Sequence, residues 1–76
     1  MRLSITAFGK SHKALVITGP KEKVNQAAEK IDGQRHHYKM DYSDFTILEN
    51  GHAEAEFVVH RSHHKKAANY IRDLIR

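Results

Sequence analysis

The chain has 76 residues, of which 39% are hydrophobic and 29% charged, and this length predicts a single small domain over residues 1–76. It contains no cysteine, which excludes disulfide bonds, thiolate metal sites and a cysteine nucleophile. The longest uncharged apolar stretch, Ala14–Ile17, is too short to span a bilayer, and the first residues lack the apolar segment of a secretory signal. We therefore expect a soluble, cytoplasmic protein that makes no membrane contact.

Charge is the most informative bulk property of the sequence. Thirteen Lys and Arg residues against nine Asp and Glu residues give a net charge of +4 at pH 7. Seven histidines can add to this charge just below neutrality. The balance favours nucleic acid or another polyanion as partner. Because the same charge also keeps a small domain in solution, composition alone leaves both interpretations open.

The first half of the chain has the pattern of two strands and a helix. Alternating apolar residues in 2–7 predict a half-buried strand, and Lys13–Thr18 predicts a more central one. Pro20 suits the start of a helix, where its missing N–H costs nothing, and Gly33 suits a left-handed residue at the helix end. The buried stripe of this helix is predicted to be Val24, Ala27, Ala28 and Ile31.

The second half begins with a predicted hairpin, with strands at Phe45–Glu49 and His52–Val59 around Asn50-Gly51. A two-residue loop would place Phe45 on the face of Glu54 and Glu56. A three-residue loop with a left-handed Gly51 separates apolar from charged residues, and we predict this register. Residues that are out of phase with Phe45 predict a bulge in residues 41–44; they are Tyr38, Met40 and Tyr42.

The last predicted element is a helix that Ser62 can cap at its N-terminus. Its apolar stripe comprises Ala67, Tyr70, Ile71, Leu74 and Ile75. The element order is then β-β-α-β-β-α, with two similar halves at 1–33 and 34–76. We predict an α+β, two-layer sandwich: a four-stranded antiparallel sheet with two helices on one face, which is a permuted ferredoxin-like arrangement.

The segment His60–Lys66 (HRSHHKK) places cations at the start of the last predicted helix. Unpaired amides and the helix dipole give such a terminus a partial positive charge, so a bound phosphate would relieve the repulsion. Alternatively, these side chains extend into water and screening removes the conflict. The residues predicted to contact the anion are Arg61, His63, His64, Lys65 and Lys66.

Two further basic segments accompany this one. In Gln34–Lys39, the predicted contacts are Arg35, His36 and Lys39, which flank Tyr38. Tyr38 could stack on a base or pack under the helices. A third cluster comprises Lys10, His12 and Lys13.

Histidine spacing in His60–His64 is compatible with metal ligation, but no Asp or Glu stands nearby as a further ligand. We therefore expect no metal site and no cofactor. The serines lack the context of a catalytic nucleophile, and nothing in the sequence fixes the histidines relative to one another. The sequence accordingly predicts a protein that is not an enzyme and has no catalytic residues.

The segment Ala14–Ile31 (ALVITGPKEKVNQAAEKI) resembles the last strand and helix of K-homology RNA-binding domains. The resemblance covers 18 of 76 residues, and the GxxG loop of that family is absent, so no residue roles carry over. It favours RNA over DNA as partner. We predict a non-enzymatic protein that binds nucleic acid through its phosphates; the alternative is a regulator or inhibitor, of the type encoded by phages or mobile elements, that docks on an acidic protein surface. The oligomeric state is left open.

Overall fold

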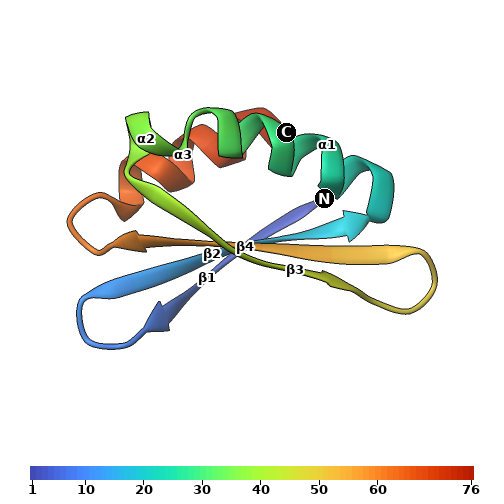
Figure 1. Cartoon of the computed structure of the whole chain (residues 1–76), viewed down its shortest axis with the longest axis horizontal. Helices are drawn as coiled ribbons and strands as arrows, with labels where there is room; N and C mark the ends of the chain where they lie inside the picture. Colours follow the sequence, from blue (N-terminus) through green and yellow to red (C-terminus); the bar gives the residue numbers. More distant parts are fainter.

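A four-stranded antiparallel sheet forms one layer of the protein, and the helices cover one of its faces (Figure 1). The computed structural model describes all residues from Met1 to Arg76. Its elements are β1 (Arg2–Phe8), β2 (His12–Pro20), α1 (Lys21–Gly33), α2 (Arg35–Tyr38), β3 (Met40–Ile47), β4 (His52–His60) and α3 (His64–Ile75). The strand order is β1-β2-β4-β3. This arrangement confirms the predicted permuted ferredoxin-like sandwich, to which the structure adds the single-turn helix α2.

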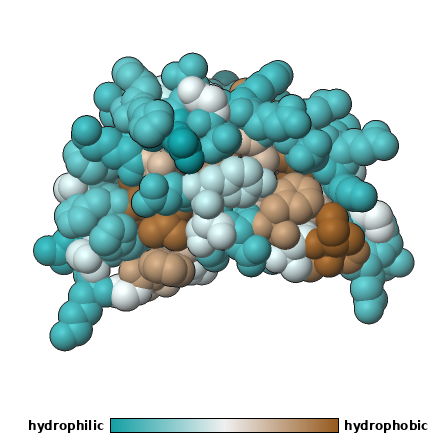
Figure 2. Space-filling model, viewed as in Figure 1, coloured by the Kyte–Doolittle hydropathy of each residue, from teal (hydrophilic) through white to brown (hydrophobic).

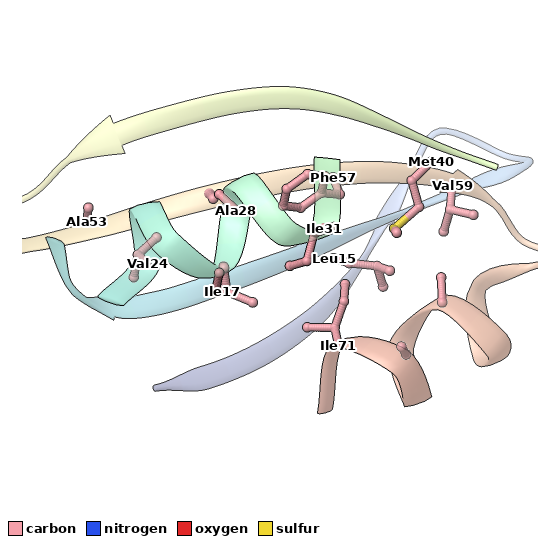
Figure 3. Packing of buried hydrophobic residues seen from close by; sticks show 14 residues of the cluster. Leu15, Ile17, Val24, Ala28, Ile31, Met40, Ala53, Phe57, Val59 and Ile71 are labelled. Atoms are coloured by element: carbon pink, nitrogen blue, oxygen red, sulfur yellow. The ribbon is translucent and has the colours of Figure 1, made fainter. Parts of the chain in front are cut away.

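The core lies between the sheet and the two longer helices, as the close view in Figure 3 shows. Alternate residues of β2 and β4, among them Leu15, Ile17 and Phe57, point toward the helices and are fully buried. The predicted stripe of α1 is buried against them: Val24, Ala27, Ala28 and Ile31. No polar or charged side chain is buried. The core therefore depends on apolar packing alone, which leaves the charged residues on the surface.

The hairpin between β3 and β4 has the predicted register. Phe45 pairs with Ala55 and Ile47 with Ala53, so the apolar residues of both strands share the helix-covered face. Gly51 is left-handed, with φ of +75°, and Asn50 is left-handed as well. The register shifts between Tyr42 and Asp44, which confirms the predicted bulge.

The predictions at two helix ends were wrong. Ser62 does not cap α3, which begins at His64 without a side-chain cap. Instead, the Oγ atom of Ser62 lies 2.8 Å from the Nδ1 atom of His60, so the hydroxyl is engaged in the preceding turn. Gly33 is the last residue of α1 and has no positive φ; the left-handed residue is Lys39, with φ of +57°, after the extra turn of α2. The reversal thus occurs six residues later than predicted.

Candidate nucleic-acid interface

Four strand ends and three chain segments meet at one end of the sandwich, on the left in Figure 1. Because neighbouring strands run in opposite directions, the last residues of β1 and β4 lie at the same end as the first residues of β2 and β3. The segments that surround these ends are 9–13, 35–39 and 60–66. We call these three segments together the basic end.

Specific contacts join the segments of the basic end. The backbone N–H of Arg61 donates to the carbonyl oxygen of Ser11 at 2.8 Å, which fastens the loop after β4 to the turn between β1 and β2. The rings of His12 and His60 lie on paired residues, with centroids 5.3 Å apart. The Nζ atom of Lys66 lies 5.9 Å from the ring centroid of Tyr38, so α3 approaches α2. Clusters that are far apart in the sequence therefore form one surface.

The basic end concentrates the positive charge of the protein. It holds seven of the thirteen Lys and Arg residues, six of the seven histidines and no Asp or Glu, whereas the rest of the chain has six Lys and Arg against nine acids. Arg35 forms the only ion pair of these segments, to Asp32 at 3.8 Å. Figure 2 shows hydrophilic side chains over this end and over the helical layer. The other six Lys and Arg side chains of the basic end have no carboxylate partner.

All of the predicted contact residues lie at the basic end. Seven of them are exposed: Arg35, His36, Lys39, Arg61, His63, Lys65 and Lys66. His64 is half-buried, and its Nδ1 atom lies 2.8 Å from the carbonyl oxygen of Arg61. Because a carbonyl only accepts, Nδ1 carries the proton and donates, which leaves Nε2 of the neutral ring as an acceptor. Arg35 is the weakest member of the set, since its ion pair to Asp32 already satisfies part of its charge.

Lys65 and Lys66 lie in the first turn of α3. No acidic residue lies in that turn, and no side chain caps its free amides. The first turn of α1, at the opposite end of the molecule, contains Glu22. The cation-rich terminus predicted from HRSHHKK is therefore present, one residue later than the predicted cap.

Tyr38 packs against the protein and does not present a free ring. It stacks on Tyr70 with centroids 4.4 Å apart, and the edge of His37 meets it at 4.8 Å. Burial raises the pKa of Tyr70 above 10.0, and the neighbouring Tyr38 adds to the rise. Of the two interpretations of Tyr38, the structure supports packing beside the helices.

One residue that sequence reasoning did not select, Phe8, also lies beside the basic end. Phe8 closes β1 and pairs with His12, which in turn pairs with His60. Phe8 is 48% exposed. The available signal was its position in the polar phase of the first strand, after Arg2, Ser4 and Thr6. An aromatic residue in the solvent-facing phase of a strand has no packing role in the core.

Metal ligation finds no support in the side-chain arrangement, since no three His, Asp or Glu side chains are grouped to hold an ion. No helix is long and apolar enough to span a membrane. Comparisons with family models, with curated proteins and with solved structures found no match.

Proposed function

We propose that this chain is a non-enzymatic nucleic-acid-binding protein that contacts phosphates with its basic end, and RNA in preference to DNA. The observation that supports the proposal is the convergence of three segments that contain seven Lys and Arg residues, six histidines and no carboxylate, with Asp32 of α1 as the only acid paired to them. The preference for RNA rests on the K-homology-like segment Ala14–Ile31. The proposal extends to a cytoplasmic location, where such a protein would meet RNA.

The dimensions of the basic end suit a short stretch of backbone. The principal extents of the molecule are 35 × 22 × 17 Å, and the basic end lies at one tip of the longest axis. A width of 22 Å corresponds to about six base-pair steps along the axis of a duplex, at ~3.4 Å each. Six unpaired Lys and Arg side chains can therefore engage several phosphates at once, each with release of a counterion.

Away from the basic end, the sheet face that carries no helices is unfavourable for a polyanion, because it presents acidic side chains. Glu54 and Glu56 of β4 are in the opposite phase to the buried residues of that strand and face away from the helices. They pair with Thr46 and Asp44 of the edge strand. These carboxylates repel a polyanion laid along the sheet, so the phosphates are confined to the basic end.

The test compares two charge reversals, each in the first turn of one of the two long helices. Lys65→Glu with Lys66→Glu changes the first turn of α3, and Lys21→Glu with Lys23→Glu changes the first turn of α1 at the other end of the molecule. Fluorescence anisotropy with labelled mixed-sequence RNA and DNA, at several salt concentrations, gives the affinity and its salt slope.

We expect the variant in α3 to bind about tenfold more weakly and its salt slope to flatten by roughly two units, since two phosphate contacts are lost. The variant in α1 carries the same total charge, and its affinity should fall much less. Equal loss in both variants would show that only net charge matters. No binding by the wild type at low salt would overturn the proposal and favour a protein partner with an acidic surface.

A further inference from the structure

Among the six Phe and Tyr side chains, only Phe8 is exposed; the other five are buried or half-buried. Its neighbours on β1 show why: Leu3 and Ile5 pack against the core, so the alternate positions face away from the helices. Phe8 is the last residue of this outward-facing set and lies at the basic end. An exposed phenyl ring thus adjoins the strongest concentration of positive charge in the protein.

Phe8 belongs to a row of three rings that crosses three strands. Phe8 pairs with His12, and His12 pairs with His60, so all three side chains share the helix-free face. The rings of His12 and His60 meet edge to face, with centroids 5.3 Å apart and an interplanar angle of 79°, so only one of the two imidazoles can present its face to a given base. Directly paired residues of adjacent strands have Cβ atoms ~5 Å apart, so the row presents a ring at each step of about that length.

Hydrogen bonds orient the two imidazoles of the row. The Nδ1 atom of His12 lies 3.0 Å from the Oγ atom of Ser11, and the Nδ1 atom of His60 lies 2.8 Å from the Oγ atom of Ser62. The backbone N–H of Ser62 also donates to His60 Nδ1, at 3.1 Å. Both rings are therefore held by the turn residue beside them and do not need to be ordered by a ligand.

The charges around the row of rings indicate a negatively charged partner. Lys10 lies in the turn between Phe8 and His12, and Arg61 directly follows His60. The basic end has no carboxylate, so a polyanion is favoured there. A ligand that offers both planar rings and negative charge matches this combination, and single-stranded nucleic acid is such a ligand. In a duplex the bases are paired and stacked, and their faces cannot reach a protein ring.

We propose that Phe8, His12 and His60 form a platform on which bases of single-stranded nucleic acid stack, while Lys10 and Arg61 contact the adjoining phosphates. This inference rests on the proposed function and adds its ligand class. Stacking on an aromatic side chain tolerates any base, since every base has a π-face. The platform therefore favours single strands over duplexes without sequence specificity.

The test uses Phe8→Ala, with Phe8→Tyr as the variant that retains the ring. Ile47→Ala is the matched control, because Ile47 is another exposed apolar side chain, at the far end of the sheet. The probes are a mixed-sequence single-stranded RNA, the same strand with abasic positions, and an RNA duplex. Far-UV circular dichroism and thermal unfolding verify that each variant is folded.

We expect Phe8→Ala to bind the single strand about tenfold more weakly, since one base–aromatic stack is worth ~1–3 kcal/mol. Its affinities for the abasic strand and the duplex should stay at the wild-type level. Phe8→Tyr and Ile47→Ala should bind all three probes as the wild type does. In NMR spectra of the wild type, the ring protons of Phe8, His12 and His60 should shift upfield with the single strand only.

The results separate this inference from the proposed function. Reversal of Lys65 and Lys66 should weaken binding of all three probes, whereas Phe8→Ala should weaken only one. If Phe8→Ala binds the single strand as tightly as the wild type does, the proposed platform is overturned and the proposal of phosphate binding is unaffected. An equal loss for duplex and single strand would also overturn it, because stacking cannot explain weaker duplex binding. No binding of any probe by the wild type would overturn both proposals.

Discussion

Replacing Phe57 with alanine tests the structural basis of the whole sandwich. The side chain is 0% exposed and belongs to the central strand β4, where it pairs with Leu15 of β2 and Tyr42 of β3. Its ring stacks on Tyr42 with centroids 4.6 Å apart. In Figure 3 it lies beside α1, near Ile31 of that helix, and both residues belong to the same buried cluster. One ring therefore connects three strands and the first helix.

The expected loss of stability follows from this burial. An aromatic side chain buries ~150–250 Å². At ~25 cal/mol per Å² this corresponds to about 4–6 kcal/mol for complete burial. Alanine keeps the Cβ atom but leaves a cavity, and such changes cost ~3–5 kcal/mol. A domain of this length has a free energy of unfolding of about 4–11 kcal/mol, so Phe57→Ala should be marginally stable or unfolded.

Urea unfolding followed by circular dichroism measures this loss. Phe45→Ala provides the comparison, since Phe45 is half-buried on the edge strand β3 and should lose only ~1–2 kcal/mol. A loss below ~1 kcal/mol for Phe57→Ala would refute the argument from burial. Equal losses in both variants would show that central and edge positions of the sheet contribute alike, which contradicts the described core.

The other predictions concern pH and a turn. Burial, with smaller contributions from Asp32, Asp44 and Glu29, raises the pKa of Tyr42 above 10.0, so the unfolded chain loses this proton first and stability falls above about pH 10. Tyr42→Phe should match the wild type at pH 8 and lose less stability in urea unfolding at pH 11. Gly51→Ala should cost ~1–2 kcal/mol, because φ of +75° is unfavourable for alanine, whereas Gly33→Ala in α1 should be neutral or stabilising in the same assay.

The sheet could be predicted because its register is determined by residue phase. Placing Phe45 and Ile47 opposite Glu54 and Glu56 would have buried charge, and only the three-residue loop avoided this. The same phase argument required the bulge before Asp44. The two-layer sandwich followed from two similar halves that each needed a partner to bury a helix. These conclusions depend on burial, which is the largest free-energy term in a small domain.

The helix ends were less predictable because several weak interactions compete there. Ser62 has a suitable hydroxyl for a cap, but His60 lies two residues away and engages it in the loop. Gly33 can adopt a left-handed conformation, yet the chain gains another helical turn before it reverses at Lys39. A cap or a helical turn is worth about 1 kcal/mol, so small local differences decide between the alternatives.

The basic segments could be found in the sequence, but their convergence could not. Each segment flanks a strand end, and only the complete pairing of β1, β2, β4 and β3 places these ends together. The row from Phe8 to His60 depends in addition on two separate registers. Such a site is formed by contacts between residues up to 50 positions apart, such as Ser11 and Arg61, which local periodicity does not encode.

The contrast between the two long helices carries the functional argument further. The first turn of α1 places Glu22 between Lys21 and Lys23, whereas the first turn of α3 contains Lys65 and Lys66 without any acid. Each such cation costs a few tenths of a kcal/mol, which a buried core of this kind tolerates. Local preferences are commonly violated where a protein binds its ligand. A bound phosphate would remove this unfavourable interaction, so anion binding and the stability of α3 should increase together.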